Sequence, residues 1–210
     1  CNGNVTGLRS GGIIASESYY CDVSNCTFTG TITGQYSGGI FGQSSVSCTA
    51  SNCTTTLVNT NTTGDSFGGI FGQNSNGCTA TYCNFIGDIS SPGNGGGGIF
   101  GAYSKNGTAT NCVYTGNIYK SVWCYAGGIF GSSSTTCAAI YCNFNGDLYG
   151  DRSGGIFGAS VTGCSAEYCN FNGIDIPFYS GGIFAGYATT SKATNCTTTC
   201  ESMNVTGGSS

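Results

Sequence analysis

A segment of five residues, Gly-Gly-Ile-Phe-Gly, recurs seven times along this chain, with small changes in the first and last copies. The copies begin at Gly11, Gly38, Gly68, Gly97, Gly127, Gly154 and Gly181. They lie 27–30 residues apart, and a cysteine follows the first glycine of every copy after 15 residues. All differences in length therefore fall between that cysteine and the next copy. A fixed segment beside a variable one is typical of stacked coils that carry their insertions at one corner.

The residues that start at this cysteine alternate in character. One repeat reads Cys83, Phe85, Gly87 and Ile89 at every second position, and across the repeats the residues in between are mostly Thr, Asn and Asp. Alternation with a period of two predicts a β-strand with one buried face. The second repeat departs from this pattern at Thr55.

Each repeat is therefore predicted to contain about three short strands. They lie around the Ile-Phe of the anchor, around a Cys-Thr-Ala segment, and around the alternating segment described above. One coil cannot bury its own core, whereas stacked coils can. We expect a single all-β domain over residues 1–210, a parallel β-helix (β-solenoid) of seven coils. Residues 204–208 repeat the Asn-Val-Thr-Gly of residues 4–7 and begin another Gly-Gly, so we expect partial coils at both ends.

The anchor, followed about 15 residues later by Asn-Cys-X-Phe-X-Gly-X-Ile, resembles the GLUG motif, a Gly-Gly-Leu-Val-Gly repeat that ends in an aromatic-Thr-Gly-X-Val strand. The motif occurs in surface proteins that include adhesin-like and peptidase-associated ones. The resemblance covers nearly the whole chain and implies a parallel β-helix, usually right-handed. This chain departs from the motif in its many cysteines and in Phe where Val is usual, which makes it a cysteine-rich variant.

Fifteen cysteines are unusual for a reducing compartment, and they favour an oxidising, extracellular one. Repeats four and seven lack the first cysteine of the pair but contain the two extra ones, which suggests compensated pairing. The disulfide candidates are Cys21, Cys26, Cys48, Cys53, Cys78, Cys83, Cys112, Cys124, Cys137, Cys142, Cys164, Cys169, Cys196 and Cys200. Pairs within a coil require a turn one or two residues before the second cysteine, and pairs between coils are equally open. The alternative is a ladder of buried free thiols that act as small core residues.

Seven Asn-X-Ser/Thr sequons agree with a location outside the cell or on a cell or particle surface. The glycosylation candidates are Asn4, Asn25, Asn52, Asn61, Asn106, Asn195 and Asn204. The chain has no apolar run near 18 residues, so we expect no membrane span. Its net charge is −4 and its five basic residues are scattered, so we expect no nucleic-acid partner.

Catalytic chemistry is not expected. The chain contains no histidine, which excludes Ser-His-Asp and Cys-His sites and weakens any case for zinc. Asp88 and Asp147 occupy equivalent positions two repeats apart, and Asp147, Asp151, Arg152 and Asp175 could gather at one corner. We interpret these acids as solvated turn residues, and the glycines at 95–98 as a corner insertion without the Lys-Ser/Thr of a phosphate loop. No catalytic, metal or cofactor site is predicted.

We therefore expect a non-enzymatic extracellular structural protein, a disulfide-rich glycoprotein that self-assembles head to tail into a filament, coat or surface fibre by coil stacking. The alternative is an adhesin or glycan-binding shaft. A stripe of Asn and Tyr that precedes the second cysteine, including Tyr141 and Tyr168, could contact surface glycans. Rows of outward Thr, such as Thr27, Thr29 and Thr31, also suggest ice binding, but Asn interrupts them in repeats three, five and six.

Overall fold

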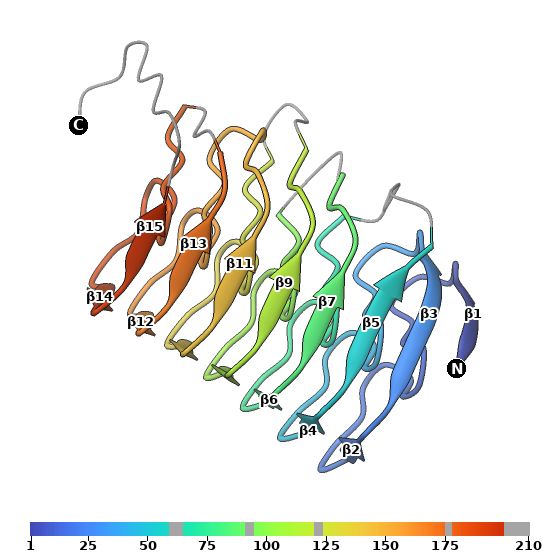
Figure 1. Ribbon diagram of the computed structural model, residues 1–210. Coiled ribbons are helices and arrows are strands. Elements are labelled where there is room, and N and C mark those ends of the chain that lie inside the picture. The colour runs from blue at the N-terminus through green and yellow to red at the C-terminus, as the bar shows by residue number, and fades with distance from the viewer. Residues whose placement is uncertain (59–64, 91–94, 120–123, 175–177, 200–210) are drawn as a thin grey trace.

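The computed structural model describes residues 1–58, 65–90, 95–119, 124–174 and 178–199. These residues form an all-β solenoid of about seven turns, whose strands build two parallel sheets (Figure 1). The sequence-based prediction of a parallel β-solenoid is therefore confirmed. The described residues contain no helix, and thus no helix that could span a membrane.

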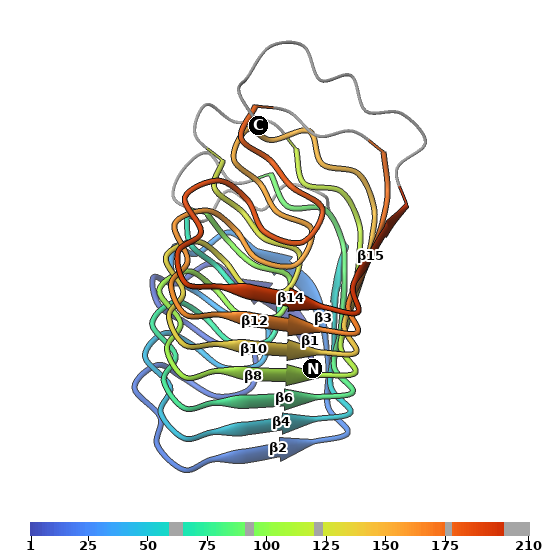
Figure 2. The same cartoon turned by 90° about the vertical axis from the view of Figure 1, so that its left-hand side faces the viewer.

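Each of the seven coils contributes one strand to each sheet, and the residues before the first anchor add an eighth strand to the larger sheet. The larger sheet has the order β1 (Asn2–Val5), β3 (Thr27–Ile32), β5 (Thr54–Leu57), β7 (Asn84–Ile86), β9 (Val113–Thr115), β11 (Asn143–Asn145), β13 (Asn170–Asn172) and β15 (Thr197–Thr199). The smaller sheet contains β2 (Asp22–Ser24), β4 (Thr49–Ser51), β6 (Thr79–Thr81), β8 (Thr108–Thr110), β10 (Ala138–Ile140), β12 (Ser165–Glu167) and β14 (Lys192–Thr194). Figure 2 shows this smaller sheet as a stack from β2 to β14.

The third side of each coil, formed by the anchor, differs from the prediction. It makes isolated parallel bridges, such as Gly38 to Gly68 and Phe41 to Phe71, instead of a continuous strand. The anchor bends sharply between these bridges: a Cβ added to Gly68 would lie 1.8 Å from the carbonyl oxygen of Phe71. The two glycines thus permit a bend that side chains would block, and the bend interrupts the strand.

Columns of equivalent side chains fill the interior. The anchor phenylalanines stack ring on ring from Phe41 to Phe184, with centroids 4.7–5.0 Å apart and planes within 11°. A second column follows the larger sheet, where Phe85, Tyr114, Phe144 and Phe171 lie 4.6–5.3 Å apart. Buried Ile of the anchor and Ala of the smaller sheet complete the core. Strand spacing of about 4.8 Å in a parallel sheet matches the spacing of stacked rings, so one coil contributes one ring to each column.

Left-handed residues turn the chain at the corners. Between the two sheets, the residue before the second cysteine has a φ of 52–54° in all seven coils. This column consists of Asn25, Asn52, Tyr82, Asn111, Tyr141, Tyr168 and Asn195. Asn tolerates this conformation better than most residues, and tyrosine adopts it here because the stacked backbone imposes it. The turn required for two cysteines of one coil to face the same interior is therefore present.

Candidate functional site

The cysteines form two columns inside the stack. Cys53, Cys83, Cys112, Cys142 and Cys169 lie one above another behind the larger sheet, and a shorter column contains Cys48, Cys78, Cys137 and Cys164; all are buried. Each thiol bonds to two carbonyl groups: the Cys83 thiol donates to Ala50 O in the neighbouring coil and to Thr81 O in its own, both at 3.5 Å. Burial also raises the pKa of the Cys78 thiol to about 11, so this thiol stays protonated at neutral pH.

Thirteen cysteines of the described residues are free thiols in the structure, and this corrects the disulfide prediction for them. The corrected candidates are Cys21, Cys26, Cys48, Cys53, Cys78, Cys83, Cys112, Cys137, Cys142, Cys164, Cys169 and Cys196. The buried thiol of Cys124 donates a hydrogen bond to the carbonyl oxygen of Tyr119. Cys200 lies outside the described residues. The physical reason is that the thiols are satisfied by the backbone carbonyls around them and pack as small core residues, which was the alternative interpretation. Cys1 belongs to neither column, since it lies beside Phe28 at the end of β1.

The sequons that the structure describes all present an exposed asparagine. Asn25, Asn52 and Asn195 lie at the left-handed corner between the sheets, Asn106 lies at another left-handed corner, and Asn4 lies on β1. Asn61 and Asn204 fall outside the described residues. Exposure at a corner leaves room for a glycan without disturbing the coil behind it.

Asp88 and Asp147, the acids at equivalent positions of their repeats, accept hydrogen bonds from backbone N–H groups of the next coil. The carboxylate of Asp88 accepts the backbone N–H of Asn117 at 2.8 Å, and Asn117 Oδ1 accepts that of Asp147 at 2.9 Å. Asp147 in turn accepts the N–H of Ile174 at 2.7 Å. These side chains thus continue the hydrogen-bond ladder of the larger sheet beyond its strands.

Asp151 and Asp175 are the remaining acids of the corner that the sequence suggested. Asp151 has a buried oxygen, Oδ1, without a hydrogen-bond partner, and Asp175 lies outside the described residues. The described residues also hold no group of three or more His, Cys, Asp or Glu side chains placed to bind a metal ion.

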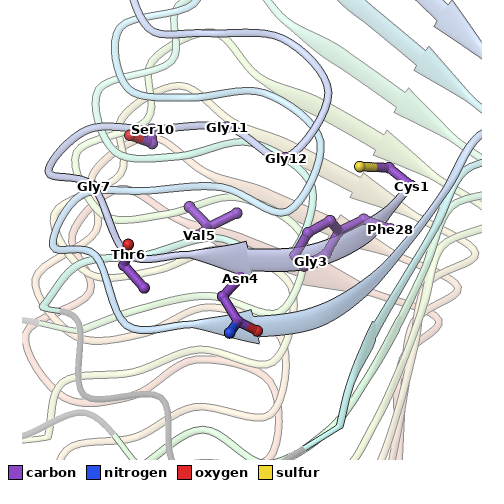
Figure 3. A pocket seen from close by; sticks show the side chains of 10 residues that line it. All are labelled: Cys1, Gly3, Asn4, Val5, Thr6, Gly7, Ser10, Gly11, Gly12 and Phe28. Carbon is purple, nitrogen blue, oxygen red and sulfur yellow. The ribbon is translucent and has the colours of Figure 1, made fainter.

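A hollow of about 200 Å³ lies on the face of the stack nearest β1 (Figure 3). Its lining consists of Cys1, Gly3, Asn4, Val5, Thr6, Gly7, Ser10, Gly11, Gly12 and Phe28. Gly12 borders it beside the ring of Phe28: a Cβ added there would lie 2.5 Å from this ring. The hollow has no carboxylate in its lining, and it opens on the ring of Phe28, which Thr55 separates from the aromatic column of the larger sheet.

Aromatic side chains gather on the outer surface. At the corner between the sheets, Tyr141 and Tyr168 stack with ring centroids 4.9 Å apart and planes 9° from parallel. Tyr82 lies in the same column and is also exposed. The predicted Tyr stripe is thus confirmed as an exposed feature, with a stacked pair in coils five and six.

Sequence reasoning missed a second aromatic group, which we term the arginine–tyrosine cluster: Tyr125, Arg152, Tyr179 and Tyr187. The Arg152 guanidinium carbon lies 5.3–5.6 Å from the centroids of the three rings. Arg152 also donates a hydrogen bond to the hydroxyl of Tyr125. The signal in the sequence was weak, because the residue two before each anchor varies among Arg, Tyr, Ser and Gly.

The polar side chains on the outer face of the larger sheet bond to one another. Asn170 donates to Asn143 at 2.8 Å, Asn172 donates to Asn145 at 3.0 Å, and Thr199 donates to Asn172 at 2.6 Å. From coil five to coil seven, this face therefore carries Asn and Thr ladders that link neighbouring coils.

Comparison with protein-family models, with curated proteins and with solved structures found no match to this chain.

Proposed function

We propose that this protein is a non-enzymatic structural shaft, exported to an extracellular or surface location, that assembles by stacking its coils end to end. The observation that carries the proposal is the unbroken register of the stack. Equivalent residues pair from coil to coil across both sheets, as in Thr49 to Thr79 to Thr108, without a change of strand direction. Parallel strands in continuous register form a template for another strand of the same kind.

The outermost strands supply the contact for assembly. β1 is the last strand of the larger sheet, and it bonds to β3 through the carbonyl groups of residues such as Cys1 and Val5. Successive residues of a strand direct their backbone groups to opposite sides, so those of Asn2 and Asn4 face away from β3. The hollow beside Phe28 is bordered by the ring and by backbone, and it lies at the face of the stack where an added coil would dock.

The experiment compares the purified chain with two variants at one position of β1. We expect rods under the electron microscope and a sedimentation coefficient that rises with concentration. Asn4→Pro removes an edge N–H and should abolish assembly, because proline cannot donate to a ladder. Asn4→Thr is the matched control: it also removes the sequon but keeps the edge donor, so it should assemble like the parent chain. A parent chain that stays monomeric at all concentrations would refute the proposal.

A glycan-binding shaft is the second candidate function, and the exposed aromatic groups support it. The exposed faces and edges of tyrosine rings can pack against the apolar faces of sugars, while the arginine–tyrosine cluster adds a cation. A glycan array should then show saturable binding that is lost in the double variant Tyr141→Ala and Tyr168→Ala. Tyr82→Ala serves as the control, because this ring is exposed in the same column without a stacked tyrosine.

A further inference from the structure

Two pairs of exposed tyrosines are held face to face between consecutive coils. Tyr141 and Tyr168 are 51% and 41% exposed, with their ring centroids 4.9 Å apart. Tyr119 and Tyr149 are each 40% exposed, with centroids 5.5 Å apart and planes 12° from parallel. The neighbouring backbone is paired in register in both cases, so the stack itself fixes each pair. This arrangement presents two phenol rings, side by side and open to solvent, at two separate places.

We propose that both pairs are sites of oxidative tyrosine cross-linking, in which a peroxide-dependent one-electron oxidant joins adjacent coils through dityrosine. Each phenol loses one electron and one proton and becomes a phenoxyl radical. The two radicals form a carbon–carbon bond between their ortho carbons. Each coupled carbon then loses its hydrogen as the ring regains aromaticity, and the phenol groups are restored. The balance is the loss of one hydrogen atom from each ring and the reduction of one hydrogen peroxide to two waters.

The surroundings of the second pair assist the loss of the proton. The hydroxyl of Tyr149 donates to Asp147 Oδ2 at 2.9 Å, so a carboxylate is placed to accept the phenolic proton as the electron leaves. The hydroxyl of Tyr119 accepts from the side-chain amide of Asn117.

The thiols of the two cysteine columns are less accessible to a soluble oxidant than the paired tyrosines. The column cysteines are buried behind the sheets, and the thiolate is the reactive form of cysteine. A soluble oxidant therefore reaches the exposed tyrosine pairs before these buried column thiols, whereas Cys1 is exposed and Cys21, Cys26 and Cys196 are partly exposed.

Tyr82 provides an internal comparison. It occupies the same left-handed column as Tyr141 and is 57% exposed. Its neighbours in that column, in the coils on either side, are Asn52 and Asn111. Tyr82 is therefore at least as exposed as Tyr141 but has no tyrosine next to it in the column. It tests whether pairing or exposure alone decides the cross-linking reaction.

The experiment treats the dilute full-length chain with peroxidase and hydrogen peroxide, followed by denaturation, trypsin digestion and mass spectrometry. The few basic residues make the products distinct. A link between Tyr141 and Tyr168 joins peptides 121–152 and 153–192, and a link between Tyr119 and Tyr149 joins peptides 106–120 and 121–152. Each product should be lighter by two hydrogen atoms than the sum of its peptides and should show dityrosine fluorescence.

Single variants then assign each link. Tyr168→Phe should remove only the first product, Tyr149→Phe should remove only the second, and Tyr82→Phe should leave both unchanged. Asn111→Tyr should create a new product that joins peptides 10–105 and 106–120, through Tyr82 and the introduced tyrosine. The proposal is overturned if the treated monomer lacks both products, or if they form to the same extent in chain unfolded by guanidinium.

Discussion

Three buried polar atoms in the described residues have no hydrogen-bond partner: Thr55 Oγ1, Asp151 Oδ1 and Ser153 Oγ. Thr55 is informative because it occupies a position of the aromatic column, in register with Phe28 and Phe85. It is fully buried, so its hydroxyl has left water without finding an acceptor. A buried hydroxyl without a partner destabilises the folded state by about 1–3 kcal/mol.

We therefore expect Thr55→Val to raise the free energy of unfolding by about 1–3 kcal/mol, because valine keeps the shape and removes the unsatisfied hydroxyl. Denaturant titration followed by far-ultraviolet circular dichroism measures this change. Thr54→Val is the matched control, since Thr54 lies next to it but on the outer, partly exposed side of β5. Equal effects of the two substitutions, or a loss of stability in Thr55→Val, would contradict the argument.

At the scale of the element, the conformation of the anchor depends on its two glycines. In five of the seven anchors, the second glycine lies under a carbonyl of the next coil and against an aromatic ring of the core; Gly39 and Gly182 lie against threonines instead. A Cβ on Gly98 would lie 2.1 Å from the carbonyl oxygen of Gly128 and 2.8 Å from the ring of Tyr114. Two coils would have to separate to admit it, so this glycine is required by close approach of the backbone.

We expect Gly98→Ala to destabilise the fold by at least about 3 kcal/mol, because backbone and ring leave no room for the methyl group. Gly77→Asn is the comparison. Gly77 has a φ of +62°, but its neighbours in the same column, Ser47 and Asn106, adopt this conformation with side chains. A Cβ there meets nothing closer than 3.6 Å, so the change should stay within about 0.5 kcal/mol. Thermal unfolding of both variants checks the contrast, and similar losses in the two would refute it.

The strands of the two sheets could be predicted from the sequence where the spacing of the repeat determines their position. The constant distance from anchor to second cysteine predicted the register, and the alternation around Phe85 predicted which side chains enter the core. The bend within the anchor was not predicted, because the Ile-Phe of the anchor indicated a strand, whereas the two glycines before it permit a sharp turn. The corners were also hidden, since residues as different as Glu17, Tyr20 and Asn25 adopt a positive φ there.

The site was less predictable than the fold. The exposed Tyr141 and Tyr168 could be read from their shared position, but the arginine–tyrosine cluster depends on three coils that sequence alone does not bring together. The disulfide prediction was wrong because the number of cysteines indicates a compartment, whereas the structure places the column cysteines as free thiols in the core.

At the scale of the whole molecule, each coil contacts only the coils on either side of it. The described coils at the two ends of the stack are less well covered: Ile14 and Phe184 are partly exposed, whereas Phe71 and Phe100 are fully buried. The stability of such an array is a sum of coil and interface contributions, and opening begins where an interface is missing.

We expect amide hydrogen exchange to show a gradient along the stack. The amides of Phe71, Phe100 and Phe130 should be protected the longest, and those of Ile14 and Phe184 should exchange first. Exchange followed by mass spectrometry on peptic peptides measures this directly. A flat profile, with equal protection in all seven coils, would mean that the stack unfolds as one unit. In assembled rods, the gradient should disappear, because stacking covers the end coils.

The direction of the inter-coil hydrogen bonds has a mechanical consequence. They run along the axis of the stack, from one coil to the next, as in Thr79 N–H to Cys48 O. A tensile force on the two ends therefore acts along these bonds and loads them one interface at a time. Such a shaft would resist bending and compression through its stacked rings, yet under tension it would lengthen by the release of whole coils. Since every coil holds 27–30 residues, each released coil would add nearly the same contour length.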